Sequence, residues 1–157
     1  MSFLDFLKNL FSNNKKDARI ITADLSKTFG EKDPLEVGLF EGKTALPDKN
    51  VNIKINGVTY SRKTDENGVA HLNINLPVGE YEPMISFVDD DYNYTSAYCK
   101  VTVNPVITTQ DMKMTEHDGS QFIAIASSVT GVRLSGVPIV FTVNGGERMD
   151  NRSLFLL

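Results

Sequence analysis

The sequence has no tryptophan, one cysteine and only two histidines among its 157 residues. A lone cysteine excludes an intrachain disulfide. No apolar run approaches the roughly 18 residues that a membrane-spanning helix needs, so we expect no membrane span. The formal net charge of −4 lacks the basic surplus of a phosphate-binding protein, so we expect no nucleic acid among the partners.

Catalytic patterns are missing as well. Ser-His-Asp spacing, a Gly-rich phosphate loop and a Cys/His metal pattern do not occur, so we expect no enzyme, no catalytic residue, no cofactor and no metal. By alternation along its strand, His71 points to solvent, whereas Cys99 falls on the apolar face as a buried, inert thiol. Asp89-Asp90-Asp91 lacks the spaced ligands of a calcium loop. We expect a solvated loop there, pinned by the packing of Tyr92 and Tyr94.

Residues 2–11 have the spacing of a short amphipathic helix, with Ser2 and Asp5 as a capping box. No basic region precedes the apolar residues, so we expect no secretory signal. A helix this short is marginal alone and must dock on something: its own domain, a partner protein, or a membrane surface, for which Lys15 and Lys16 offer a small basic flank. The apolar docking face consists of Phe3, Leu4, Phe6, Leu7, Leu10 and Phe11.

From about residue 20, apolar residues recur at every second position, which is typical of antiparallel strands with one buried face. Turn signals such as Asn56-Gly57 separate these segments, and short strands at such intervals indicate a β-sandwich. Pro83 lies within the strand expected over residues 81–87, so we expect that strand to be an edge or to be bulged. The other alternating segments cover residues 35–39, 51–55, 70–76 and 97–103.

The chain also contains an internal repeat, with an offset of about 87 residues that becomes about 88 after a single insertion. Asp24-Leu25 corresponds to Asp111-Met112, and the alternating Val51, Ile53 and Ile55 correspond to Ile139, Phe141 and Val143. The second copy has no counterparts of the strands from residue 70 to residue 103. We therefore expect an all-β protein with an anchor helix and tether over residues 1–19, a complete sandwich over 20–104 and a partial second sandwich over 105–157.

A partial sandwich leaves strand edges and an apolar face open, which favours pairing with another chain. Residues 107–157 then pair with other copies, giving a homo-oligomer, or with another protein by strand addition. Alternatively, they pack on the first sandwich, or they are the unfolded remnant of a rearranged gene. We favour assembly. The expected assembly-strand residues are Phe122, Ile125, Ile139, Phe141 and Val143.

The run VNIKINGVTYSRKTDENGVAHLNINLPVGEY (residues 51–81), followed by DDDYNYTSA (89–97), carries a family resemblance. It resembles the immunoglobulin-like repeats of adhesin-like proteins from methane-producing archaea. Those repeats favour Asn-Gly-Val, Thr-Asp-x-Asn-Gly, Leu-Asn-Ile-Asn-Leu and Pro-x-Gly-x-Tyr in this order. The resemblance covers residues 20–103 well and 107–146 in part, and it implies immunoglobulin-like sandwiches.

Such repeats occur on cell-surface proteins, and similar modules occur on fibres and adhesins of tailed viruses. Without an export signal, and with an anchoring helix, the sequence favours a non-enzymatic virion protein: a tail or head fibre or adhesin component of an archaeal tailed virus. It would dock on other virion proteins through the helix and present its modules to a host cell-surface receptor. The alternative is a fragment of a cell-surface adhesin that acts as a spacer or carbohydrate-binding module. A regulatory or carrier domain of an enzyme complex is a third hypothesis.

Overall fold

The computed structural model describes residues 2–11, 15–111, 119, 121–143 and 146–150. These residues form one short helix and fifteen strands, so the predicted all-β fold class is confirmed. The chain divides into two compact units. Unit 1 comprises Met1–Ala23, Leu35–Leu72 and Glu82–Cys99, and unit 2 comprises Asp24–Pro34, Asn73–Tyr81 and Lys100–Leu157. The domain boundaries that we expect from the repeat, after residues 19 and 104, stay a prediction.

The N-terminal helix α1 (Phe3–Phe11) forms as its apolar spacing predicts. Ser2 Oγ accepts a hydrogen bond from the Asp5 N–H at 3.1 Å, and the Asp5 carboxylate accepts one from the Ser2 N–H at 3.3 Å. This is the predicted capping box, which satisfies N–H groups that lack a partner inside the first turn. Within the described part of the chain, no helix is long and apolar enough to cross a membrane.

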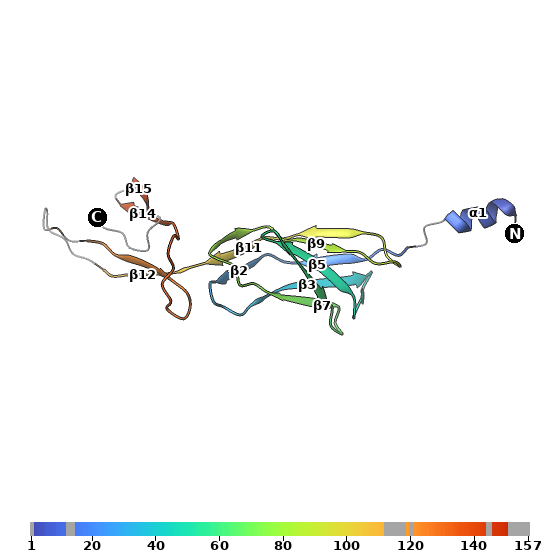
Figure 1. Cartoon of the computed structure of the whole chain (residues 1–157), viewed down its shortest axis with the longest axis horizontal. Coiled ribbons are helices and arrows are strands. Elements are labelled where there is room, and N and C mark those ends of the chain that lie inside the picture. Colours follow the sequence, from blue (N-terminus) through green and yellow to red (C-terminus); the bar gives the residue numbers. More distant parts are fainter. Residues whose placement is uncertain (1, 12–14, 112–118, 120, 144–145, 151–157) are drawn as a thin grey trace. The chain divides into compact units, whose positions relative to one another are not determined.

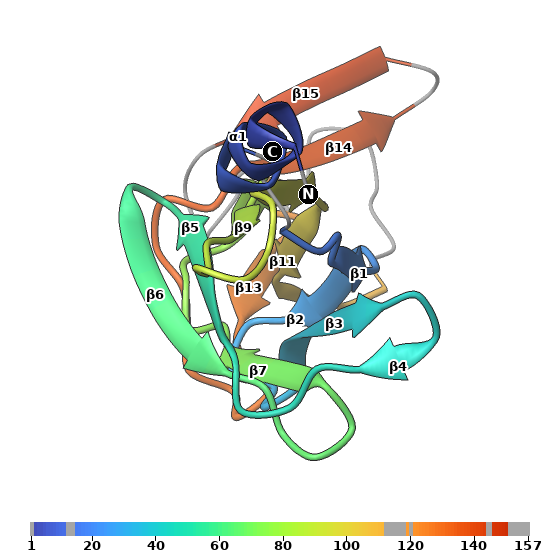
Figure 2. The ribbon, with the colours of Figure 1, turned by 90° about the vertical axis from the view of Figure 1, so that its right-hand side faces the viewer.

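Unit 1 contains two four-stranded sheets, and Figure 1 shows β5 and β9 in one layer and β3 and β7 in the other. Strand β1 of one sheet contacts β9 and β10 of the other, so the layers form a sandwich. In the first sheet, β3 (Pro34–Glu41) pairs with β1 (Arg19–Thr22), β4 (Thr44–Ala45) and β7 (Val69–Asn73). The second sheet has the order β10 (Thr95–Tyr98), β9 (Met84–Phe87), β5 (Asn50–Ile55) and β6 (Val58–Lys63). Figure 2 shows β5 beside β6, and β3 between β1 and β4.

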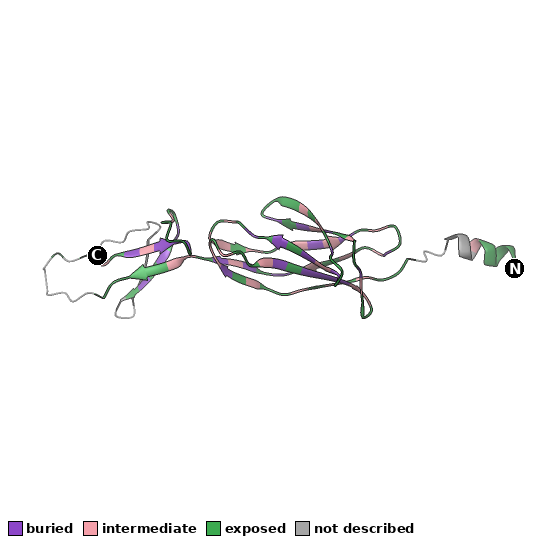
Figure 3. Ribbon diagram, turned by 90° about the horizontal axis from the view of Figure 1, so that it is seen from below, coloured by how far each residue is buried: buried purple, intermediate pink, exposed green. Residues whose placement is uncertain are grey.

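The core of unit 1 follows from the alternation of apolar residues. Leu35, Val37 and Leu39 of β3 are buried, as are Val51 and Ile53 of β5. Because successive side chains of a strand point to opposite faces, each sheet has one buried face, and Figure 3 shows this as buried positions along the strands. Each such side chain contributes roughly 2 kcal/mol by leaving water.

Two further sequence predictions are confirmed in unit 1. The His71 side chain is 45% exposed and lies 3.6 Å from the carboxylates of both Glu36 and Asp65, on the solvent face. Cys99 is buried.

The strand expected over residues 81–87 is in fact two strands. β8 (Gly79–Tyr81) pairs with β11 (Val101–Asn104), whereas β9 lies between β5 and β10. The prediction of an edge strand is therefore wrong for β9. Pro83 lies in the break between the two strands, where its missing N–H costs no ladder hydrogen bond. The expected strand 97–103 is likewise interrupted at Cys99-Lys100, between β10 and β11.

Unit 2 contains a three-stranded sheet and two hairpins. In the sheet, β11 lies between β2 (Leu25–Thr28), which is parallel to it, and the antiparallel β8. The hairpins pair β12 (Val106–Thr109) with β13 (Ala124–Ser127), and β14 (Ile139–Val143) with β15 (Gly146–Asp150). A small core of buried residues consists of Ala124, Ala126, Val137, Ile139 and Phe141, with Val78, Phe122 and Leu134 packed against it.

The strand registers repeat along with the sequence. In β1–β3, Arg19 faces Phe40, and in β12–β13, Val106 faces Ser127, so both partners are shifted by the same 87 positions. In β5–β6, Asn50 faces Lys63, and in β14–β15, Ile139 faces Asp150. Here one partner is shifted by 89 positions and the other by 87. In an antiparallel pair this is the same register as a shift of both partners by 88 positions. The second copy therefore reproduces two antiparallel strand pairs of the first.

Replacing Gly68 by alanine will destabilise the fold by about 2–3 kcal/mol. Gly68 has φ +74°, and an added Cβ would lie 2.8 Å from the Leu39 carbonyl oxygen and 3.0 Å from the Leu46 nitrogen. The control is Gly57→Ala, because Gly57 has φ +78° but no atom within 4 Å of an added Cβ. This variant should lose only about 1 kcal/mol. Urea denaturation measures both, and equal losses would contradict the role of the close contact.

Candidate functional site: a clamp around Tyr92

The loop between β9 and β10 places Tyr92. Asp89 Oδ1 accepts the Asp91 N–H at 2.9 Å, which turns the chain at the start of the loop. Tyr92 is then buried, with 7% of its surface exposed, and its ring centroid lies 5.6 Å from that of Phe87. The expected pinning of this loop by Tyr92 is confirmed. The same expectation for Tyr94 is wrong, since Tyr94 is 63% exposed.

Hydrogen bonds join this loop to the segment that follows helix α1. The Lys16 N–H donates to the Asp91 carbonyl at 2.9 Å, and the Asn93 N–H donates to the Lys16 carbonyl at 2.8 Å. The Asn93 side-chain amide also donates to the Asp17 carboxylate at 2.8 Å. Lys16 and Asp17, which we expected in a polar tether, are therefore bound to the loop.

The Tyr92 hydroxyl and Lys16 share one carboxylate. The hydroxyl donates to Glu41 Oε2 at 2.7 Å, and Lys16 Nζ lies 3.3 Å from the same oxygen. The hydrogen bond to Glu41, together with desolvation, raises the pKa of Tyr92 to about 12. In return, the hydrogen bonds from Tyr92 and Lys16 hold the pKa of Glu41 below its ordinary value.

Lys49 approaches the same ring. Its Nζ lies 2.7 Å from Asp89 Oδ2 and 5.4 Å from the centroid of the Tyr92 ring, and Lys16 Nζ lies 5.9 Å from that centroid. Both distances are within the range of cation–π attraction. The hydrogen bond from Lys49 lowers the pKa of Asp89, and the same bond raises the pKa of Lys49. We call Lys16, Glu41, Lys49, Asp89 and Tyr92 the Tyr92 clamp.

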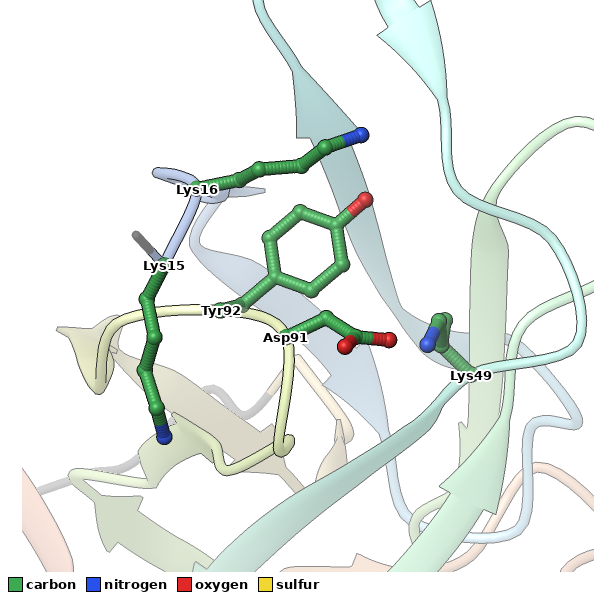
Figure 4. Close-up of a pocket in the computed structure, with 5 residues that line it drawn as sticks. All are labelled: Lys15, Lys16, Lys49, Asp91 and Tyr92. Carbon is green, nitrogen blue, oxygen red and sulfur yellow. The ribbon is translucent and has the colours of Figure 1, made fainter. Parts of the chain in front are cut away.

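A hollow of about 300 Å³ lies at the clamp, and Figure 4 shows the five residues that line it. The Asp91 carboxylate points toward Lys49, while the Lys15 side chain is directed away from the ring. A sugar would need an exposed aromatic face for stacking, whereas the Tyr92 ring is buried and its hydroxyl is bound to Glu41. The geometry therefore suits holding the incoming chain better than binding a carbohydrate. No group of acidic, histidine or cysteine side chains in the described part could hold a metal ion.

The predicted docking residues of α1 are exposed where they are described. Phe3 is 75% exposed, Leu4 66% and Phe6 50%, and Leu7 is half-buried. The side chains of Leu10 and Phe11 lie outside the described residues. Docking of this face stays a prediction.

The predicted assembly-strand residues divide between a core and the surface. Ile139 and Phe141 are buried in the small core of unit 2, and Phe122 packs edge-to-face on Phe141 with ring centroids 5.5 Å apart. Ile125 is half-buried, and the side chain of Val143 lies outside the described residues. Because Val78 of the first copy also packs against this core, the second copy makes contacts within the chain. Assembly with other chains stays a prediction.

Comparison with known proteins identifies no family for this chain. No protein-family model matches it, and no curated protein does. Among solved structures, it is similar to fibronectin(III)-like modules of Clostridium thermocellum CbhA, with 18% identity and a TM-score of 0.35 over 88% of this chain and 75% of that one.

Two bacterial adhesin structures are also similar. One is a Ca²⁺-stabilised adhesin with which an Antarctic bacterium binds ice, with 13% identity and a TM-score of 0.33 over 87% of this chain and 38% of that one. The other is a 1.5-MDa ice-binding adhesin, with 15% identity and a TM-score of 0.36 over 91% of this chain and 52% of that one. The chain thus spans about half or less of these adhesin chains.

Most of the Tyr92 clamp was missed by the sequence analysis. Lys16, Glu41, Lys49 and Tyr92 come from four separate segments, and no local pattern links them. The one local signal was a tyrosine directly after an acidic run.

Tyr92→Phe will lower the free energy of unfolding by about 1 kcal/mol at neutral pH, because the bond to Glu41 is lost. Folding raises the pKa of Tyr92 from 10.0 to about 12, so its contribution is complete below pH 10 and is lost as the pH rises through 12. The difference between wild type and variant should therefore vanish over this interval in urea titrations. Tyr98→Phe serves as control, since Tyr98 is 60% exposed. A difference that persists at the alkaline end contradicts the assignment.

Proposed function

We propose that this chain is a non-enzymatic spacer module of a cell-surface adhesin, built to carry tension between the segments attached to it. The observation that carries the proposal is the parallel pairing of β2 with β11. Leu25 faces Val101, and Thr28 faces Asn104, so both strands run in the same direction. The preceding chain joins β2 at Leu25, and the following chain leaves β11 at Asn104. Because the strands are parallel, these two connections lie at opposite ends of the pair.

Parallel pairing determines how a pulling force acts on these strands. Tension applied before β2 and after β11 draws the strands along their axes in opposite directions. The hydrogen bonds of the ladder then resist together, instead of opening one after another as in a hairpin pulled from its ends. Forced unfolding is governed by the unfolding rate, and a ladder that must break at once makes this rate low.

Side chains reinforce both ends of the pair. The Asp24 carboxylate accepts the Lys100 N–H at 2.7 Å, and the Asn104 amide donates to Ser26 Oγ at 3.1 Å. From β2, Lys27 is buried, and its ammonium donates to the Ile74 and Asp33 carbonyls at 3.1 Å each. Sliding β2 would break both hydrogen bonds while the ammonium is still buried, and a buried charge without partners is costly, so Lys27 resists this displacement.

The turn after β2 also holds the second copy. The Phe29 N–H donates to the Asn104 carbonyl at 2.8 Å, and the Phe29 carbonyl accepts the Val129 N–H at 3.1 Å. Gly30 has φ +97°, and an added Cβ would lie 3.1 Å from Val129 Cγ2. A close, hydrogen-bonded junction of this kind suits a stiff spacer better than a flexible linker.

The adhesin assignment is supported by the sequence resemblance of residues 51–97 to adhesin-like repeats. A cell-surface location belongs to the same proposal. A virion fibre could use the same mechanical property, and the virion role stays a prediction. Docking on virion proteins, a host receptor, carbohydrate binding and homo-oligomer formation also stay predictions.

Single-molecule pulling of the full chain by its two termini tests the proposal. Asn104→Ala removes the side-chain bond to Ser26 and should lower the force at which the sandwich unfolds, with an equilibrium loss of about 1 kcal/mol. Thr59→Ala, on the exposed face of β6 outside the β2–β11 pair, is the matched control and should leave the force unchanged. If Asn104→Ala lowers equilibrium stability but not the unfolding force, the pair does not carry the load and the proposal is wrong.

A further inference from the structure

The second sheet of unit 1, with the order β10, β9, β5 and β6, has an outer face whose side chains are set by its strand registers. Residues that face each other across two strands point to the same side of the sheet. Val51, Ile53 and Ile85 are buried and mark the inner side, so the alternate positions point outward. The outward side chains form two rows across the four strands, none of them buried: Tyr98, Met84, Lys54 and Thr59 in one row, and Ser96, Ser86, Asn52 and Ser61 in the next.

Two exposed tyrosines lie along the β10 side of this face. Tyr98 is 60% exposed, and Tyr94, directly before β10, is 63% exposed. Extended by one position, the β9–β10 register places Tyr94 beside Val88, which is 67% exposed. Four positions along a strand correspond to about 13 Å, so the two tyrosines are spaced for an elongated ligand. Rings left in water to this extent would gain free energy from contact with a flat apolar surface.

The polar side chains next to the tyrosines have no partners in the described part of the chain. Asn52, Ser86 and Ser96 occupy the row between Tyr94 and Tyr98, and their side chains form no hydrogen bond with a described residue. They therefore offer hydroxyl and amide donors and acceptors to a ligand without giving up an interaction within the protein.

The charges of this face limit the class of ligand. Lys54 is the one charged residue in the two rows. Nearby, Lys63 of β6 is paired with Asp48 at 2.8 Å, and Glu82, just before β9, is exposed, so the charges largely cancel. Nucleic acids and anionic membranes need several unpaired cations, which this face lacks. Exposed aromatic rings beside uncharged hydrogen-bonding groups suit a sugar, which has apolar C–H faces and hydroxyl edges.

We propose that this face binds an all-equatorial, β-linked pyranose chain, as in cellulose or chitin. The chain runs along β10, with sugar rings over Tyr94 and Tyr98 and hydroxyl groups against the polar side chains between them. Equatorial substituents leave the axial C–H groups uncovered on both faces of such a ribbon, which suits stacking on a sheet. This goes beyond the spacer role, which requires no ligand and which the pulling experiment tests separately.

Calorimetric titration of the full chain with cellohexaose and with chitohexaose is the first experiment. We expect at least one of them to bind, with a Kd between about 10 µM and 1 mM. Maltohexaose is the matched control ligand, because it has the glucose units of cellohexaose in an α-linked, coiled chain. It should bind at least roughly tenfold more weakly, since a coil cannot stack on both tyrosines at once.

Variants place the binding on this face. Tyr98→Ala and Tyr94→Ala should each weaken binding roughly tenfold, because each removes one stacking ring. Tyr98→Phe keeps the ring and should change the Kd by no more than about twofold. Ile21→Ala removes a side chain that is 45% exposed on the other sheet and should leave the Kd unchanged. Circular dichroism confirms that each variant is folded before it is titrated.

Binding that prefers a β-linked ligand and falls with the loss of either tyrosine ring supports the proposal. The proposal is wrong if neither β-linked ligand binds, or if maltohexaose binds equally well. Unchanged affinity in Tyr98→Ala, or an equal loss in Ile21→Ala, also overturns it, because the sugar then binds elsewhere. A dimer in light scattering that Tyr98→Ala dissociates shows that a second copy covers the face, with the same consequence.

Discussion

The sheet of unit 2 depends on the central strand β11, which pairs with β2 on one side and with β8 on the other. This pairing joins parts of the chain that are far apart, as the hydrogen bond between Asp24 and the Lys100 N–H, 76 positions along the sequence, shows. Such long-range ladders have a high cost in chain entropy, which the burial of Val101 and Val103 helps to offset. The mechanical role that we propose depends on the same pairing. The chain first enters this sheet through β2 and last leaves it through β11.

The Tyr92 clamp in unit 1 also joins parts of the chain that are far apart in the sequence, but it does so mainly through side chains. The segment after helix α1 reaches the sandwich at Lys16, where two backbone hydrogen bonds alone would form a weak attachment. A buried aromatic ring between two lysines, with Glu41 and Asp89 as their carboxylate partners, adds side-chain bonds from four segments. Exposed ion pairs contribute little by themselves, so the strength of the clamp depends on the buried ring and its hydroxyl.

The two copies of the repeat share strand registers but differ in the strands and residues that pack around them. The hairpins β12–β13 and β14–β15 keep the registers of β1–β3 and β5–β6. In the first copy, β7 and β9 complete the sheets. In the second copy, Val78 packs against a small core that contains Ile139 and Phe141, and β14 pairs with β15. The same local pairings therefore belong to a sandwich in the first copy and to a smaller core in the second.

The sequence by itself determined the class of the fold, the amphipathic helix with its capping box, the buried faces of β3 and β5, and the repeat. Each of these depends on the period of apolar residues or on turn chemistry within a few positions. Only the tertiary structure decided that the segments around Pro83 and Cys99 divide into separate strands, that β2 lies parallel to β11, and that Lys16, Glu41, Lys49 and Tyr92 meet. Strand partners and charge clusters depend on which distant segments the folded chain brings together. The spacing of residues within one segment carries no information about these partners.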